Sequence, residues 1–556
     1  MSKFAIYQLF VRLFGNSNPN PQINGNIDEN GCGKLNTITT DILSKIKNLG
    51  ITHIWYTGII RHATTAAYPA IPANNDAIVK GKAGSPYAIT DYYDIHPDLA
   101  ENVAERMSEF EQLLDRTQQE GLKVLIDFVP NHLSREYKSL NISAKEEDFG
   151  ESDNTSLHFH PQNNYYYFSE KTLTLPKANN YVEYPAKATG NDVFNPYPQT
   201  IDWYETIKLN YGVDYLNQKS RHFSPIPKTW RMMKEILMFW SAKRIDGFRC
   251  DMAEMVPVEF WAWVIPQIKK KNPDILFIAE IYNPEAYSTY IGQGGFDYLY
   301  DKVDFYDTLR LIIEGKQSTR LLSELWKKQN GLETKMLRFL ENHDEQRIAS
   351  RFFANNPHKG IPAFFLTACM HKNPILIYFG QEFGERAEGE SGFSGDDGRS
   401  TIFDYWIIPS IQSWQNADYK IEKLPVDTQK IYNQYKEIIK FSLNEIAITD
   451  GDFYDLMWIN LSNINFNSDK VFAFLRCHER SLFLCLSNFS NHEEKIKVII
   501  PEHAFEYCQL PTAKLLNFQF VDYFSGKKLK ISGSECIISG FPATLDTNSY
   551  AVYQIK

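Results

Sequence analysis

The chain has 556 residues, more than one hydrophobic core usually serves, which predicts about two or three structural units. A formal net charge of −10 argues against a nucleic-acid partner, because phosphate backbones bind clustered basic surfaces. No stretch is long and apolar enough to span a membrane, and the N-terminal run MSKFAIYQLFVRLF reads as a strand instead of a signal peptide. We therefore expect a cytoplasmic protein without a membrane partner.

Short apolar runs alternate with longer amphipathic segments along most of the chain, as in repeated strand and helix units. The first predicted strand is 5–10, and apolar residues at helical spacing mark segments such as 104–120. The remaining predicted strands are 51–55, 124–128, 247–251, 276–279, one near Tyr298, 336–340 and 375–379. Eight such units predict an α/β fold, a (β/α)8 TIM barrel, in which reactive side chains gather at the carboxyl ends of the strands.

Two segments depart from this alternation. Residues 133–213 are rich in Tyr, Asn, Pro and Lys and too long for a simple loop, which predicts a subdomain (domain B) inserted after the third strand. Residues 449–556 consist of alternating short strands and predict a separate C-terminal all-β sandwich domain. The barrel is then expected over 1–132 and 214–448.

Four short motifs end apolar runs with charged or imidazole side chains. They are DFVPNH (127–132), DGFRCD (246–251), FIAE (277–280) and ENHD (341–344). A single aspartate at a strand end is more often a cap or a surface ion-pair partner, and His132 alone is more often a buried core histidine. The combination of Asp251, Glu280 and Asp344 with arginine and histidine instead favours a site that protonates a leaving group and stabilises a cationic sugar.

In content and order these motifs resemble the α-amylase family, glycoside hydrolase family 13. The resemblance covers nearly the whole chain, including the insertion after the third strand and the C-terminal β domain. It implies a retaining α-glucan hydrolase that cleaves α-1,4-glucosidic bonds of maltodextrins, starch or glycogen fragments. An α-glucan oligosaccharide or polysaccharide is then the expected partner, and the oligomeric state stays open.

The resemblance also implies a role for each carboxylate. Asp251 is similar to the family's nucleophile, Glu280 to its general acid/base, and Asp344 to the third acid that stabilises the transition state. Arg249 lies two residues before Asp251 on the same strand and is expected to hold that carboxylate ionised. Negative charge from the neighbouring acids is expected to raise the pKa of Glu280.

Six further residues are candidates for binding the sugar. They are Tyr87, Asp127, His132, Arg249, His343 and Arg347. His132 and His343 resemble the pair that hydrogen-bonds the sugar where cleavage occurs, and Tyr87 resembles the tyrosine that stacks on it, although ordinary packing is the alternative for Tyr87. Arg347 either lines the sugar site or pairs with Glu341, and the sequence leaves both open.

Calcium is the cofactor that the resemblance raises, and we predict that none is required. Asn131, the one candidate metal ligand, matches a position that binds calcium in many members, but Met255 replaces the family's calcium-linked histidine. Residues 26–30 resemble the start of a second calcium loop. Lys34 stands where the final carboxylate of that loop belongs, so its ammonium is expected to act as the cation while residues 26–30 form a simple turn.

Two alternatives to a hydrolase stay open. A 4-α-glucanotransferase of the same family would share the three acids and pass the sugar to a hydroxyl group instead of water, and the motifs do not separate the two. A catalytically silent sugar-binding protein on the same fold is the other alternative, against which the three intact acids argue. Glu254 and Met255 replace a Lys-His pair of many endo-acting amylases, which argues against attack on long starch. Because no secretion signal is recognised, imported maltodextrins or stored glycogen are the expected substrates of a cytoplasmic enzyme.

Overall fold

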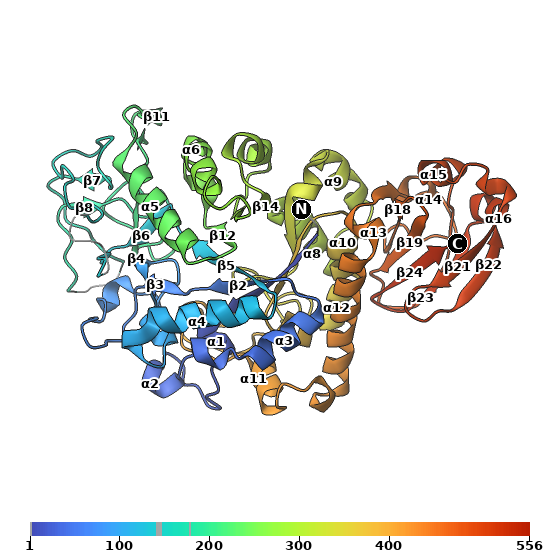
Figure 1. Cartoon of the computed structure of the whole chain (residues 1–556), viewed down its shortest axis with the longest axis horizontal. Coiled ribbons are helices and arrows are strands. Elements are labelled where there is room, and N and C mark those ends of the chain that lie inside the picture. Colours follow the sequence, from blue (N-terminus) through green and yellow to red (C-terminus); the bar gives the residue numbers. More distant parts are fainter. Residues whose placement is uncertain (1–2, 141–146, 177–179) are drawn as a thin grey trace.

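The computed structural model describes residues 3–140, 147–176 and 180–556, and its centre is a closed barrel of eight parallel strands (Figure 1). In chain order the barrel strands are β1 (Ala5–Phe10), β2 (His53–Thr57), β5 (Lys123–Phe128), β12 (Gly247–Cys250), β13 (Leu276–Ala279), β14 (Tyr298–Tyr300), β15 (Met336–Phe339) and β16 (Ile375–Tyr378). β16 closes the ring by pairing in parallel with β1, where Ala5 lies opposite Ile375. The predicted TIM barrel is confirmed.

The second barrel strand begins two residues later than predicted. Thr52 lies beside Ala5, where its amide donates to the Ala5 carbonyl at 3.0 Å and its hydroxyl accepts from the Ala5 amide at 3.0 Å. Because the side chain takes part in this exchange, the regular ladder between β1 and β2 starts one residue further on, with Ile6 opposite His53.

Both sides of the barrel strands are buried and apolar. Ile6 and Trp55 belong to one buried cluster, whereas Tyr7 and Ile54 belong to a second, larger one that includes the helices. Successive residues of a strand point to opposite sides, so the two clusters correspond to the barrel interior and to the layer under the helices. This double burial explains why the strands read as continuous apolar runs in the sequence.

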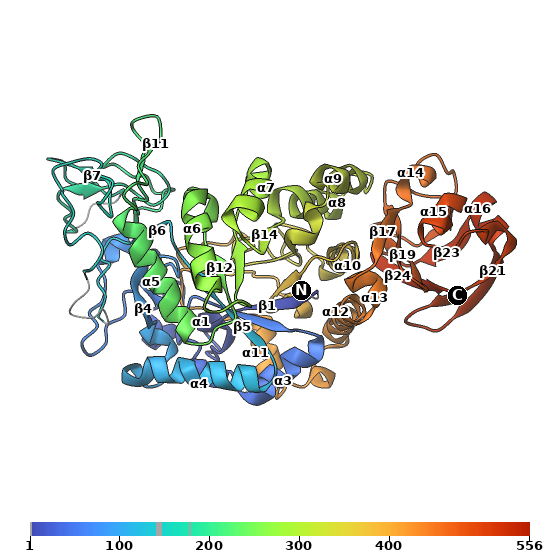
Figure 2. The same ribbon diagram turned by 45° about the horizontal axis from the view of Figure 1, so that its top comes forward.

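Helices surround the barrel on the outside (Figures 1 and 2). The longer ones are α3 (Thr40–Leu49), α4 (Arg106–Gln119), α5 (Lys228–Ala242), α6 (Val258–Lys269), α8 (Asp307–Ile313), α9 (Leu321–Gln329), α10 (Ile361–Cys369), α11 (Pro409–Asn416) and α12 (Val426–Asn444). Short turns of helix are α1 (Val11–Phe14), α2 (Ile27–Asn30), α7 (Tyr287–Thr289), α13 (Ile446–Thr449) and α14 (Met457–Asn460). α4 lies where helical spacing predicts it and buries Phe110, Leu113 and Leu114. Over the described ranges, none of the helices is both long and apolar enough to cross a bilayer.

The segment between β5 and β12 is mostly irregular and lies at one end of the long axis of the molecule (Figure 1). Its short strands are β6 (His132–Ser134), β7 (Tyr167–Phe168), β8 (Ala186–Lys187), β9 (Thr206–Lys208), β10 (Val213–Asp214) and β11 (Ser220–Arg221). β6 and β9 pair antiparallel, with His132 opposite Lys208. An antiparallel pair earlier in the chain, β3 (Ile60–His62) and β4 (Ile89–Ile95), follows barrel strand β2.

The C-terminal part lies at the other end of the long axis (Figure 1). Its strands are β17 (Asp452–Asp455), β18 (Val471–His478), β19 (Ser481–Asn488), β20 (Glu494–Val498), β21 (Asn517–Asp522), β22 (Lys528–Ser532), β23 (Phe541–Leu545) and β24 (Ser549–Ile555), with helices α15 (Glu502–Tyr507) and α16 (Gly533–Ile538) between them. An antiparallel sheet of order β17-β18-β19-β24-β21-β22 and a pair β20-β23 confirm the predicted β domain. The buried guanidinium of Arg476 on β18 donates to the carbonyls of Met370, Ala447, Ile448 and Gly451 at 2.8–3.0 Å, which joins the sheet to the ends of α10 and α13.

Candidate active site

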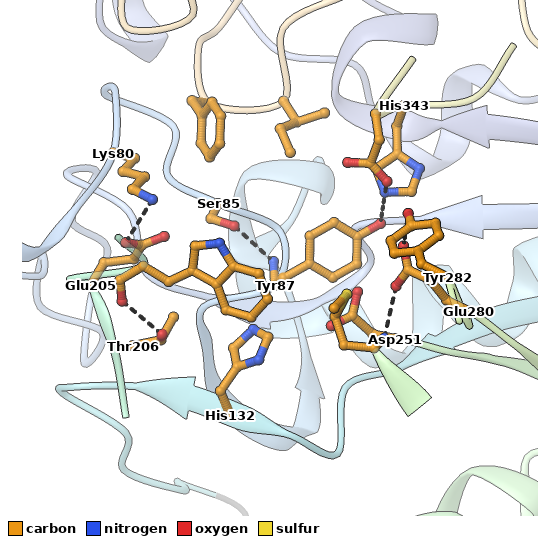
Figure 3. Close-up of a pocket in the computed structure, with 15 residues that line it drawn as sticks. Lys80, Ser85, Tyr87, His132, Glu205, Thr206, Asp251, Glu280, Tyr282 and His343 are labelled. Atoms are coloured by element: carbon orange, nitrogen blue, oxygen red, sulfur yellow. Dashed lines mark hydrogen bonds and ion pairs between the residues drawn. The ribbon is translucent and has the colours of Figure 1, made fainter. Parts of the chain in front are cut away.

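A cavity of about 360 Å³ contains most of the predicted site residues (Figure 3). Its lining consists of Lys80, Ser85, Tyr87, His132, Trp203, Glu205, Thr206, Asp251, Met252, Glu280, Tyr282, His343, Asp344, Ile402 and Phe403. The three predicted acids and three predicted sugar-binding residues, Tyr87, His132 and His343, are among them. The other three candidates, Asp127, Arg249 and Arg347, do not line the cavity.

The barrel brings the acids together because each follows a strand at the same end of the sheet. Asp251 directly follows β12, Glu280 directly follows the adjacent β13, and Asp344 lies five residues beyond the end of β15. The backbone ladder continues through the first two, since the Asp251 amide donates to Phe128 at 2.9 Å and the Glu280 amide donates to Cys250 at 3.1 Å. Parallel pairing therefore determines where these two carboxylates lie.

Arg249 binds two of the acids at once. Its Nη1 donates to Oδ1 of Asp251 at 2.6 Å, and its Nη2 lies 2.8 Å from Oε2 of Glu280. Nη1 is also 3.5 Å from Oδ1 of Asp127, and Nε donates to the hydroxyl of Tyr300 at 3.2 Å. Arg249 and Asp127 thus lie beneath the cavity and support its acids from inside the barrel.

Glu280 accepts hydrogen bonds at both carboxylate oxygens. Oε1 accepts from the hydroxyl of Tyr282 at 2.6 Å, and Oε2 accepts from the amide of Met252 at 2.7 Å. Burial, followed by repulsion from the Glu280 charge, raises the pKa of the Tyr282 hydroxyl well above its ordinary value, so this group stays a donor. The carboxylate of Glu280 is therefore oriented before any sugar arrives.

Three acids in and beneath the cavity, Asp251, Asp344 and Asp127, have raised pKa values. Burial raises the pKa of Asp251 well above its ordinary value, against the opposing effect of the Arg249 charge and with a further increase from Glu280. Burial and then Glu280 raise the pKa of Asp344 to about 7, and burial raises that of Asp127 to about 6. Arg249 acts on the pKa of Asp251 in the predicted direction, but burial outweighs it.

The cavity histidines are neutral and held by specific partners. His343 Nε2 lies 2.6 Å from the Tyr87 hydroxyl and 3.1 Å from Oδ2 of Asp344, and Gln8 contacts its Nδ1 at 2.8 Å. Burial, then the charge of Arg249, lowers the pKa of His343 well below its ordinary value. Burial, then Lys208 and Lys80, lowers the pKa of His132 to about 3. Neutral imidazoles can both donate to and accept from sugar hydroxyls.

Arg347 is placed by its ion pair instead of by the cavity. Its Nη1 donates to Glu341 at 2.9 Å and to the Phe379 carbonyl at 3.0 Å, while Nε donates to Ser400 at 2.9 Å. The residue is fully buried and its guanidinium lies 4.0 Å from the ring centre of Tyr378. The sequence left open whether Arg347 lines the sugar site or pairs with Glu341. In the structure it pairs with Glu341 and does not line the cavity.

Several cavity residues were not predicted from the sequence. Lys80 and Glu205 form a buried ion pair of 3.1 Å, and the ring of Trp203 lies 5.0 Å from that of His132. Lys80 comes from an irregular loop and Glu205 from the inserted segment, so no periodic signal marks either. Tyr282 does have a signal: it lies two residues beyond Glu280, where side chains of an extended chain point to the same side.

The one candidate calcium ligand, Asn131, already has the ammonium of Lys208 as its partner. Oδ1 of Asn131 accepts a hydrogen bond from the buried ammonium of Lys208, so it does not offer a free ligand to a metal. Among the described residues, the structure contains no group of three or more His, Cys, Asp or Glu side chains arranged to hold a metal ion. The side chains present therefore do not fit calcium at Asn131.

The ammonium of Lys34 donates to the carbonyls of Asp98 and Ala100 at 2.6 and 3.1 Å. Its expected role as a cation beside residues 26–30 stays a prediction. The acidic and amide side chains of residues 26–30 are used locally, because Asn26 and Glu29 cap α2 reciprocally. The predicted simple turn is found there as a single capped turn of helix.

Comparison with known proteins identifies the family. The model of the alpha-amylase catalytic domain matches residues 8–400, and the chain belongs to this family. Alpha-amylase 3 of Dictyoglomus thermophilum is 26% identical over 465 residues, covering 80% of this chain and 78% of that protein. The structure of an alpha-amylase from Geobacillus thermoleovorans complexed with acarbose aligns over 100% of this chain and 98% of that chain, with 18% identity and a TM-score of 0.64.

A noncanonic maltogenic alpha-amylase from Thermotoga neapolitana aligns over 99% of this chain and 98% of that one, with 20% identity and a TM-score of 0.61. These structural similarities concern the fold. Together with the family match, they define the chain as an enzyme of the α-amylase family, with glycoside hydrolase or transferase activity.

Proposed function

We propose that the protein is a retaining hydrolase of α-1,4-glucosidic bonds in maltodextrins, starch or glycogen fragments. The observation that carries this proposal is the shared contact of Arg249 with Asp251 and Glu280, which brings two carboxylates to one side of a cavity of sugar size. A retaining mechanism needs such a close pair, one acid as nucleophile and one as proton donor. Relatives named as amylases and maltases support the substrate class.

In the proposed first step, the Asp251 carboxylate attacks the anomeric carbon while Glu280 gives its proton to the glycosidic oxygen of the leaving sugar. The glucosidic C–O bond breaks and an ester bond to Asp251 forms. Arg249 offers a donor to Asp251 in its charged, attacking form.

In the second step, Glu280 takes a proton from water as the water oxygen attacks the same carbon. The ester bond breaks, Asp251 leaves as a carboxylate, and the second inversion restores the α configuration. Asp344 and His343, which contact each other at 3.1 Å, would bind hydroxyls of the reacting sugar. The ring of Tyr87 offers an aromatic face to the apolar side of that sugar.

A 4-α-glucanotransferase is the second candidate, favoured by one observation. Met252, Trp203, Ile402 and Phe403 give the cavity wall a large apolar share. Apolar walls shield the covalent intermediate from water and leave it available to a sugar hydroxyl. The chemistry of Asp251 and Glu280 would be the same, and only the acceptor would differ.

A chromatographic time course with maltotriose and maltoheptaose tests the proposal, run beside the Asp251→Asn variant as a blank. Shorter products alone support hydrolysis, and their sizes distinguish internal from terminal cleavage. Products longer than the substrate identify a glucanotransferase. If the first product has the β configuration by proton NMR, the retaining mechanism is refuted, and no product from either sugar contradicts the substrate class.

A further inference from the structure

The ammonium of Lys208 lies at the meeting point of three oxygen atoms from separate parts of the chain. Nζ is 2.7 Å from Oδ1 of Asp192 and 3.2 Å from the carbonyl of Met255, and it also donates to Oδ1 of Asn131. Lys208 itself is 1% exposed. The ammonium therefore donates hydrogen bonds to Asn131 and Met255 and forms an ion pair with the carboxylate of Asp192.

The three oxygens tie the inserted segment to the catalytic face of the barrel. Asn131 follows barrel strand β5, Asp192 lies in the inserted segment, and Met255 belongs to the turn that follows Asp251. The Asn131 amide nitrogen donates to the Gly190 carbonyl at 2.9 Å, which turns its oxygen toward Lys208. Lys208 pairs across the strands with His132, so the same residue is adjacent to a cavity histidine.

The charge of Lys208 is retained in this place. Burial opposes the charged form, but Tyr215 and Asp192 outweigh it and raise the pKa of the ammonium. A carboxylate, an amide oxygen and a backbone carbonyl form an oxygen set that hard divalent cations also use. The three oxygens therefore have the arrangement of a cation site in which the ammonium of Lys208 is the cation.

We propose that Lys208 is a built-in cation that replaces a metal ion and positions His132 and the turn after Asp251. Two consequences follow. The native protein keeps its stability without divalent metal, and exchanging Lys208 for a short acid uncovers a latent site for a calcium-like ion. The added carboxylate would then join Asn131, Asp192 and the Met255 carbonyl as oxygen ligands.

The first experiment compares the wild type, Lys208→Asp and Lys208→Met in thermal unfolding, in chelator and in millimolar CaCl₂. The melting temperature of the wild type should be the same in both. Lys208→Asp should melt lower in chelator and recover by about 3 °C or more with calcium, in a saturable way. Lys208→Met, the matched control without a carboxylate, should melt lower and not recover. Titration calorimetry with CaCl₂ should show one site in Lys208→Asp and none in the wild type.

The outcomes that overturn the proposal are also defined. A wild type that loses several degrees in chelator and regains them with calcium holds its metal elsewhere. A folded Lys208→Asp that binds no calcium shows that the three oxygens do not form a cation site. If Lys208→Asp does not fold, calcium binding by Lys208→Asn and the melting temperature of the wild type in chelator still test the proposal. The amide oxygen of asparagine also ligates calcium. None of these readouts depends on the proposed function.

The positioning role has its own readout. Loss of the ammonium in Lys208→Met should raise KM for maltoheptaose about tenfold, because the strand that pairs with His132 loses its contacts to Asn131, Asp192 and Met255. We expect kcat to change less than about threefold. Lys187→Met, on strand β8 of the same segment, is the control, and its KM should stay near that of the wild type. Equal losses in kcat and kcat/KM with an unchanged KM would contradict positioning of a sugar-binding residue.

Discussion

The hydroxyl of Tyr282 donates a 2.6 Å hydrogen bond to Oε1 of Glu280. Glu280 also accepts from the Met252 amide and forms an ion pair with Arg249, both at Oε2. Two hydrogen bonds and one ion pair on one carboxylate limit its rotation. An acid that must both give and take a proton needs this kind of orientation toward the bond being cleaved.

Tyr282→Phe should therefore lower kcat/KM about tenfold, because a hydrogen bond to a charged group contributes about 1.5–3 kcal/mol and part of it acts in the transition state. Steady-state kinetics on maltoheptaose measure the effect. Tyr287→Phe is the matched control, since the buried Tyr287 hydroxyl has no hydrogen-bond partner among the residues that the structure describes and does not line the cavity. Equal rates for both variants would show that the contact with Glu280 is not used.

Asp251→Asn should reduce turnover by about three orders of magnitude or more, because an amide cannot form the ester intermediate. Circular dichroism should show the wild-type fold, and oligosaccharide binding should persist. Glu259→Gln, which removes a surface charge paired with Arg221, should retain full activity. Turnover of Asp251→Asn within about tenfold of the wild type would contradict its role as nucleophile.

The raised pKa of Asp344 predicts a stability that falls with pH. Folded Asp344 has a pKa of about 7, against an ordinary value of 3.8, because of burial and then the charge of Glu280. Between these two pH values, Asp344 holds a proton in the folded protein that it has released in the unfolded chain. The stabilisation that Asp344 contributes is therefore fully present below about pH 4 and is lost as the pH rises through about 7.

Melting temperatures from pH 4.5 to 8 test this behaviour. Residue 344 cannot titrate in Asp344→Asn. The melting temperature of this variant should therefore rise relative to that of the wild type as the pH increases. Glu259→Gln, altered outside the cavity, should follow the wild-type curve. A wild-type curve parallel to that of Asp344→Asn would show that Asp344 does not take up a proton on folding.

We expect Lys80 and Glu205 to bind the part of the substrate that stays attached to Asp251 after the glucosidic bond is cleaved. They lie across the cavity from Glu280 and Tyr282, and Glu280 protonates the departing side in the proposed mechanism (Figure 3). Glu205→Gln should raise KM for maltotriose about tenfold with little change in kcat, because a charged acceptor for hydroxyls is lost. Lys82→Met, which removes an exposed lysine nearby, should leave KM unchanged. An unchanged KM in Glu205→Gln would exclude this residue from sugar binding.

The barrel and the meeting of the three acids were predictable, because parallel strands end at one edge and the motifs mark those ends. Asp251 and Glu280 are neighbours because their strands, β12 and β13, pair in parallel and each residue directly follows its strand. Tyr282 was within reach of the same reasoning, since it follows Glu280 by two residues. The roles assigned to these residues stay proposals that the experiments above decide.

The loops were less predictable, because the partner of a long charged side chain depends on which segments meet in three dimensions. Lys34 is close in sequence to residues 26–30 but donates to carbonyls more than sixty residues further along. Lys208 lies in a short strand, and nothing local shows that its ammonium is buried against Asp192. Lys80 likewise finds Glu205 across a long stretch of chain.

The guanidinium of Arg476 gives the C-terminal sheet an architectural role. Each carbonyl that it binds belongs to the chain that leads out of the barrel or to the end of α10, and each would lose its donor if the sheet were removed. A fragment truncated near residue 449 would expose the carbonyls of Met370, Ala447 and Ile448 together with the apolar surface of α10. The apparent domain boundary is therefore a poor place to cut the chain for expression, and the barrel and the sheet should unfold in one cooperative transition.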